Sequence, residues 1–388
     1  MAQTRPIKKA LRYAVPATVA GAAAVTVGLV PALATPGDTD LPKISAEELI
    51  TRIAASDTQR LSGTVKITTD LGLPALDGLG SGGHGGGEGN GGEDGGSEAD
   101  PRNKLTELAS GSHTLRVAAD GPDRQRVSLV EEAAEYSLVR NGEDVWAYDS
   151  ASNTVHHTVL PEGAGQEKAP EGLERITPQK AAEQALKAVD DTTSVTVDGT
   201  AKVAGQDAYQ LLIRPKQPDS TVESVRIAVD ADTGVPLRFT LAPQDGGKAA
   251  IDVGFTEVDF SKPAAETFAF KPPKGAEVTE ERLDDVRGDS AAPEREKDPR
   301  SAPSGLEVIG EGWNSVAEFE LPADVADGVK GPEAQKLLGN LTDEVKGDFG
   351  TGRFFGTRLV NALITDDGTV YVGAVTRDGL VKAANAAE

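Results

Sequence analysis

The stretch from Val225 to Phe239 constrains the fold of this chain more than any other, because it contains the pattern of a complete β-hairpin. Aliphatic and polar residues alternate on both sides of a turn made by Asp232, Thr233 and Gly234. Alternation of this kind is typical of strands with one apolar face, and glycine accepts the positive φ that tight turns need. The stretch therefore predicts an antiparallel sheet with one apolar side.

The amino terminus predicts export from the cytoplasm. Four basic residues between positions 5 and 12 precede an uncharged, largely apolar run over 13–34, which ends in the small-x-small pattern of Ala32 and Ala34. We expect residues 1–34 to be a signal peptide. An uncleaved anchor is the alternative, because the run approaches the ~20 residues that span a bilayer. In either case the rest of the chain is expected to be extracytoplasmic, secreted or anchored to the outer face of the cytoplasmic membrane.

Composition argues against several classes of function. The formal charge of -23 argues against nucleic acid and against anionic membrane surfaces as partners, because both require a basic patch. The sequence contains no cysteine, which excludes disulfides, thiol nucleophiles, thiolate metal sites and a lipidated cysteine anchor. Aromatic residues make up 4% of the chain, so any buried cavity is expected to have mainly aliphatic walls.

Residues 41–279 are expected to form one mainly β domain built as a long meander. A capping box of Ser45 and Glu48 predicts a helix from Ala46, and Thr177 followed by Pro178 predicts a second helix. Alternating patterns predict strands at 61–68, 113–119, 125–130, 136–139, 145–149, 155–160, 194–197, 208–213, 225–239 and 250–260.

Three further segments have distinct compositions. Residues 77–100 are Gly-rich and acidic and are predicted to be a disordered loop. Residues 280–304 are charged and contain proline, which predicts a linker. Residues 305–388 are predicted to form a small α+β unit of unknown role, with strands near 316–321 and 358–376 and a helix over 332–346.

The sequence lacks the usual marks of an enzyme. It contains no His-Glu-x-x-His, Gly-x-Ser-x-Gly or Walker pattern. His84 falls in the Gly-rich segment, and the adjacent His156 and His157 are expected to point to opposite faces of a strand. The Asp pairs at 190–191, 284–285 and 366–367 are typical of turns and solvated charge. We therefore expect no catalysis, no metal and no cofactor.

Two passages resemble the LolA and RseB-like superfamily. The first is the hairpin from Leu138 to Asp149, which turns at Asn141 and Gly142. The second runs from Gly205 through the hairpin described above to the Pro-Pro-Lys-Gly close at 272–275. The resemblance implies an incomplete antiparallel β-barrel, lidded by helices, that encloses a cavity for acyl chains. In carriers of this family an arginine in an early strand helps to hold the empty lid closed, and the resemblance leaves Arg124 and Arg126 as candidates for that role.

The function expected from this resemblance is non-enzymatic binding of lipid or lipoprotein acyl chains, as in a lipoprotein carrier. The alternative is an RseB-like regulatory module of envelope stress, which binds a membrane-anchored anti-sigma factor and so has a membrane protein as partner. Each cavity-lining candidate has the alternative of packing a filled core. These candidates are Val65, Ile67, Leu115, Val117, Trp146, Tyr148, Leu211, Ile213, Ile227, Leu237, Phe239 and Phe255.

Overall fold

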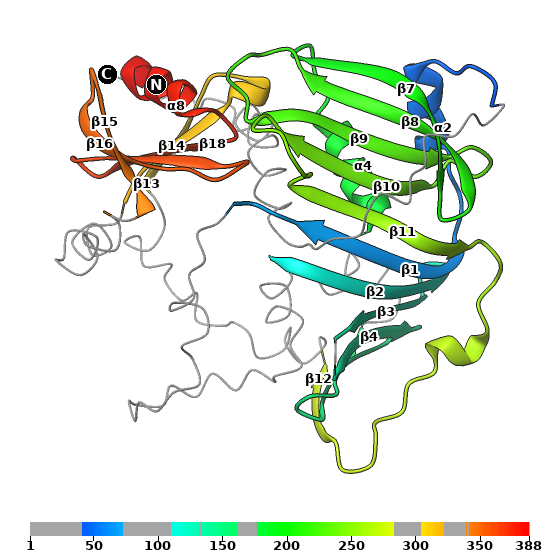
Figure 1. The fold of residues 1–388 in the computed structure, drawn as a ribbon. Coiled ribbons are helices and arrows are strands. Elements are labelled where there is room, and N and C mark those ends of the chain that lie inside the picture. Colours follow the sequence, from blue (N-terminus) through cyan, green and yellow to red (C-terminus); the bar gives the residue numbers. More distant parts are fainter. Residues whose placement is uncertain are drawn as a thin grey trace, which may run out of the picture.

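The computed structural model describes residues 41–72, 110–131, 133–160, 177–282, 304–321, 339 and 341–387. The predicted signal peptide, the predicted loop at 77–100 and most of the predicted linker lie outside these ranges. Within them, no helix combines the length and the apolar character needed to span a membrane. The described residues form two sheets (Figure 1).

The large sheet has 12 strands in the order β12-β6-β5-β4-β3-β2-β1-β11-β10-β9-β8-β7. Because β1 lies between β2 and β11, it joins two meanders into one sheet whose ends, β12 and β7, stand at opposite edges. The sheet is therefore open, and the predicted fold class, a mainly β incomplete barrel, is confirmed. The strands are β1 (Arg60–Thr69), β2 (Gly111–Asp120), β3 (Arg124–Val130), β4 (Glu135–Asn141), β5 (Asp144–Asp149), β6 (Thr154–Val159), β7 (Thr193–Val203), β8 (Gln206–Pro215), β9 (Val222–Asp230), β10 (Pro236–Pro243), β11 (Ile251–Asp259) and β12 (Glu277–Arg282).

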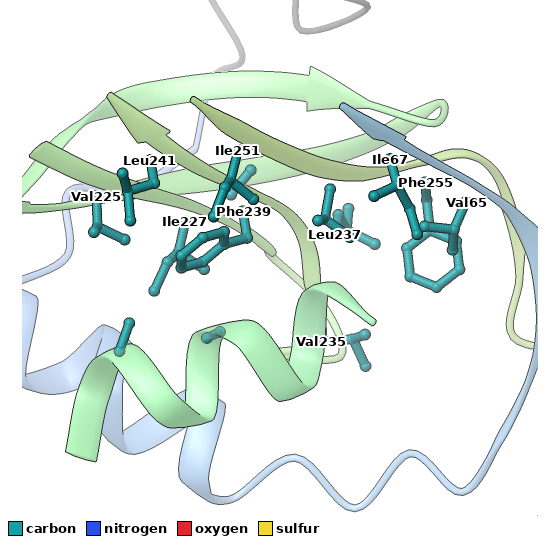
Figure 2. Packing of buried hydrophobic residues seen from close by; sticks show 14 of the residues in the cluster. Val65, Ile67, Val225, Ile227, Val235, Leu237, Phe239, Leu241, Ile251 and Phe255 are labelled. Carbon is teal, nitrogen blue, oxygen red and sulfur yellow. The ribbon is translucent and has the colours of Figure 1, made fainter. Parts of the chain in front are cut away.

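Two short helices cover one face of this sheet. Helix α2 (Ala46–Ala54) begins at the predicted capping box, in which the Glu48 amide donates to the Ser45 hydroxyl at 3.2 Å and the Ser45 amide donates to the Glu48 carboxylate at 2.9 Å. Helix α4 (Pro178–Lys187) begins after Thr177, whose hydroxyl accepts from the Lys180 amide. Helix α2 contacts β7 and β8, while α4 contacts β10 and β11. The predicted helices are thus confirmed, and both lie on the same side of the sheet (Figure 2).

The chain segment after β11 crosses the opposite face. It contains the 3-10 helix η4 (Ala265–Phe268), which contacts β3 and β4 and buries Phe268 to 1% exposure. It then forms β12, which pairs in parallel with β6, whereas the other strand pairs are antiparallel. Strand β12 extends three residues, 280–282, into the segment predicted as a linker. We call residues 260–276 the outer strap.

The small sheet has six strands in the order β13-β14-β18-β17-β16-β15. Helix α8 (Arg377–Ala387), which was not predicted, packs on one face and buries Leu380 and Ala384 beside Leu363 and Tyr371. The predicted turn at 366–368 joins the last two strands. The strands are β13 (Ser304–Ile309), β14 (Val316–Glu320), β15 (Asp343–Gly347), β16 (Gly350–Phe355), β17 (Asn361–Thr365) and β18 (Thr369–Gly373), and the 3-10 helix η5 (Gly312–Asn314) precedes β14.

The helix predicted over 332–346 is wrong in its last turn. The structure assigns helix to residues 339 and 341 but strand to 343–347, and residues 332–338 lie outside the described ranges. Val345, expected on a helical stripe, is buried on β15 in the core of the small sheet. Pairing of β15 with β16 supplies backbone hydrogen bonds and burial that outweigh the helical spacing of the leucines.

The apolar inner face as candidate functional site

The face of the large sheet that α2 and α4 cover, here called the inner face, is apolar from strand to strand. The register places Val65 opposite Leu115 on one side and opposite Phe255 on the other. Likewise Phe239 lies opposite Ile227. Residues directly opposite each other in a sheet point to the same face, so these side chains form one surface.

Ten of the twelve predicted cavity-lining residues lie on this inner face. All ten are at most 7% exposed and belong to one continuous apolar cluster. Figure 2 shows several of them pointing from the sheet toward the side on which α4 lies. The ten are Val65, Ile67, Leu115, Val117, Leu211, Ile213, Ile227, Leu237, Phe239 and Phe255.

The prediction is wrong for Trp146 and Tyr148, which do not share the inner face with the other ten residues. In β5 the inner positions are taken by Val145 and Ala147, which are 4% and 2% exposed and belong to the inner cluster. Trp146 and Tyr148 alternate with them and are only half-buried. They therefore point to the outer face, because successive residues of a strand point to opposite sides.

The outer face instead holds an aromatic cluster under the strap. The Trp146 ring stacks on His157 with centroids 3.6 Å apart, and Phe270 of the strap lies 5.5 Å from Trp146 and 5.8 Å from Tyr148. The His157 Nε2 atom lies 2.8 Å from Asp144 Oδ1. His156 lies opposite the inner residue Ala147, so the expectation that the two histidines point to opposite faces is confirmed.

Sequence inspection missed several inner residues, although most lie in strands that it predicted. These residues follow the same alternation, so the sequence pattern indicates them as well. On α4, Ala182 and Ala185 face the sheet, and small side chains allow the helix to approach closely. The missed residues of the cluster include Val127, Leu129, Tyr136, Leu138, Val225, Val229, Leu241, Ile251 and Val253 from the sheet and Leu49 and Ile53 from α2.

Ion pairs gather on the outer face. Arg238 donates from Nε to Asp252 Oδ1 at 2.8 Å, and this hydrogen bonding raises the pKa of the Arg238 guanidinium. Arg126 donates to the Thr267 carbonyl of the strap. Arg124 lies 2.6 Å from Asp120. By register Arg124 and Arg126 share the outer face with Val139 and Trp146, so neither has the position on the lid side that the family resemblance implied.

No combination of histidine and carboxylate side chains in the described ranges is arranged to hold a metal ion. The Asp230 to Gly234 segment confirms the prediction of a turn. The Asp230 carboxylate accepts from the amides of Asp232 and Thr233, at 3.2 and 2.7 Å, and from the Thr233 hydroxyl. These contacts are turn chemistry within the hairpin.

Comparison with known proteins supports the resemblance. No protein-family model matches the chain. Over 77 residues, 20% of the chain, it is 38% identical to an outer-membrane lipoprotein carrier protein of Vibrio vulnificus (strain YJ016). It is 36% identical over 77 residues to the protein of the same name from Vibrio parahaemolyticus serotype O3:K6 (strain RIMD 2210633). The chain spans 37% and 36% of the length of these relatives. The predicted resemblance to the LolA and RseB-like superfamily is confirmed.

Similar solved structures include a chain of the Pseudomonas aeruginosa MucA/MucB complex. It shares 15% identity with a TM-score of 0.38, and the match covers 87% of this chain and 96% of that one. A LolA superfamily protein from Nitrosomonas europaea shares 10% identity with a TM-score of 0.21, over 59% of this chain and 99% of that one. Likenesses at this level place no functional residues.

Proposed function

We propose that the inner face of the large sheet binds acyl chains of lipids or lipoproteins outside the cytoplasm, without catalysis. The observation that carries this proposal is the continuous, mainly aliphatic surface shared by β1, β2, β8, β9, β10 and β11. Two separate short helices pack on the same face, α2 on β7 and β8 and α4 on β10 and β11. The 77-residue similarity to lipoprotein carriers supports it. The ion pairs of Arg124, Arg126 and Arg238 lie on the opposite face, which supports it too, because an acyl chain is bound by apolar burial alone.

Helix α4 has the properties of a cover that a guest replaces. Its buried residues are Pro178, Ala182 and Ala185, and Leu186 packs against the same cluster while partly exposed. Each methylene of an acyl chain gains about 0.8 kcal/mol on burial. An acyl chain with ~10 buried methylenes therefore gains about 8 kcal/mol before ordering costs. This exceeds the combined contribution of the partly buried Leu186, at most about 3 kcal/mol, and of two alanine methyls, about 0.8 kcal/mol each.

Aliphatic walls predict weak selection among headgroups. Apolar pockets obtain specificity from a few placed polar groups, and side chains such as Leu115, Ile227 and Phe239 offer none. We propose that selection acts on the length and shape of the chain. The envelope-stress alternative, with a membrane-anchored anti-sigma factor as partner, stays a prediction that capture of such a factor by the full-length protein would test.

The test is lipid content. The purified exported protein is extracted with organic solvent, the extract is examined by mass spectrometry, and uptake of an apolar fluorescent dye is measured in parallel. We expect recovered lipid and saturable dye uptake. Repeated recovery of no lipid together with no dye uptake would overturn the proposal.

Two neighbouring residues of β2 provide matched variants. Val117 lies on the inner face at 7% exposure, and Arg116 lies on the outer face with 67% of its side chain exposed. Val117→Trp fills the inner face and is expected to reduce dye uptake about tenfold, a loss of about 1.4 kcal/mol. Arg116→Trp is expected to leave uptake unchanged. Val117→Phe is the milder variant, and circular dichroism confirms folding of each.

A further inference from the structure

The small unit is docked at one end of the large sheet. Its contacts fall on the residues after β1, on the connection between β8 and β9, and on the connection between β10 and β11. These segments lie at the same end of the strands, and helix α2 lies toward the other end (Figure 1). One end of the inner face is therefore adjacent to the small unit.

Backbone and charged groups fix this docking. Ser220 and Val375 form an antiparallel bridge, and the Thr376 amide donates to the Asp219 carbonyl at 2.7 Å. The Lys382 ammonium lies 2.9 Å from the Asp219 carboxylate. The two units thus share hydrogen bonds and an ion pair within the connection between β8 and β9.

Two side chains of the small unit complete the apolar core of the large one. Leu359 is 1% exposed and belongs to the cluster of the inner face, and its carbonyl accepts from the buried Thr221 hydroxyl. Trp313 is 7% exposed, belongs to the same cluster, and donates from Nε1 to the Thr193 hydroxyl at 2.8 Å. Thr193 is the first residue of β7, so Trp313 lies beside the beginning of that strand.

We propose that Leu359 and Trp313 form the end wall of the acyl-chain site and set the length of chain that it accepts. This inference rests on the proposed function. The methyl end of a chain lying along the strands stops at these two side chains, and the rest of the chain extends toward the opposite strand ends. If the side chains of the end wall are smaller, the site accepts a longer acyl chain, because each added methylene is buried instead of remaining in water.

The experiment measures chain-length preference with the full-length protein. Straight-chain fatty acids of about 10 to 20 carbons, each bound mainly through its methylenes, compete with the apolar dye. Leu359→Ala is expected to move the best competitor about two carbons longer, and Leu359→Phe to move it shorter. A reversal of sign between a smaller and a larger side chain is not expected from loss of stability.

The control is Leu380→Ala. Leu380 is 0% exposed and lies in the separate core of the small sheet, so its truncation destabilises the small unit without touching the inner face. We expect its chain-length preference to equal that of the unaltered protein. If the unaltered protein, Leu359→Ala, Leu359→Phe and Leu380→Ala all prefer the same chain length, the end-wall proposal is overturned and the proposed function still stands. No competition by any fatty acid in the unaltered protein would overturn the proposed function, and the end wall with it.

Discussion

Gly234 lies directly against Arg52. A Cβ atom at position 234 would be 2.6 Å from the Arg52 carbonyl oxygen, so the turn between β9 and β10 touches the last turn of α2. The Arg52 guanidinium also donates from Nη1 to the Ala231 carbonyl. The hairpin of β9 and β10 thus has a second role, because its turn positions helix α2.

Because of this contact, we expect two glycine substitutions to lower the free energy of unfolding by different amounts. Gly234 and Gly142 both have positive φ, +72° and +69°, but a Cβ at 142 meets nothing within 4 Å. Gly142→Ala is expected to cost about 1–2 kcal/mol from backbone strain alone. Gly234→Ala adds a clash with backbone and is expected to cost about 1–3 kcal/mol more. Urea unfolding measures both, and equal costs would contradict the packing of α2 on this turn.

The contacts of Arg358 with the large unit lead us to expect that the two units unfold together. Its guanidinium lies 2.9 Å from Asp245 and 3.0 Å from Asp70, and it donates to the carbonyls of Gly246 and Lys248. Arg358→Ala is expected to lower the free energy of unfolding by about 2–3 kcal/mol, because hydrogen bonds to charged groups contribute this much.

The control for Arg358→Ala is Arg353→Ala, since Arg353 is exposed on β16. Its effect is expected to stay within about 0.5 kcal/mol. Calorimetry of the unaltered protein is expected to show one transition, because the units share core residues. Two well-separated transitions, with Arg358→Ala changing neither, would refute the shared docking.

Asp120 predicts a dependence of stability on acid pH. Its carboxylate faces Arg60, Arg124 and Lys262, at 3.2, 2.6 and 3.4 Å. Burial raises the pKa of Asp120, but the hydrogen bond from Lys262 and the charges of Arg124 and Lys262 outweigh it, so the pKa lies below its ordinary value. The stabilisation is therefore present above the unfolded pKa of about 3.9 and is lost as pH falls through the folded value.

The measurement for Asp120 is urea unfolding of the unaltered protein and Asp120→Asn from neutral pH downward. The gap between their free energies of unfolding is expected to be constant near neutrality and to narrow below about pH 4. A gap that widens in acid would have the wrong sign for a depressed pKa.

We expect the two phenylalanines of the outer strap to contribute unequally to the stability of the fold. Phe268 is 1% exposed against β3 and β4, whereas Phe270 is half-buried beside Trp146 and Tyr148. Phe268→Ala is expected to cost about 3–5 kcal/mol. Phe270→Ala is expected to cost about 1–2 kcal/mol, since less apolar area is removed from water. Thermal unfolding distinguishes them, and a larger effect at Phe270 would show that the strap is held differently.

Trp146 and Tyr148 show where sequence patterns are ambiguous. Strand β5 reads Val145, Trp146, Ala147, Tyr148, so both of its faces are apolar. The strap buries the outer face and the sheet core buries the inner one, which removes the usual polar signal for the solvent side. The strands, their turns and the first two helices were predictable, because those patterns are local. The parallel pairing of β12 was not, because it depends on contacts across the whole sheet.

The small unit was less predictable for a related reason. Val345 fits the apolar stripe of the predicted helix but lies on β15, and four of the eleven residues of α8 are alanines, which give a weak apolar stripe. The packing of Leu359 and Trp313 in the core of the large unit depends on docking between units, for which the sequence offers no local signal. Ten of the twelve predicted residues share one face of the sheet, because alternation alone identifies one face of a strand.

Photo-crosslinking with a diazirine fatty acid, followed by mapping of the labelled peptides, shows which face of the large sheet the acyl chain contacts. We expect labels on inner residues such as Leu115, Ile227 and Phe239. Labels confined to Trp146 and Tyr148 on the outer face, or an absence of specific labelling, would contradict it.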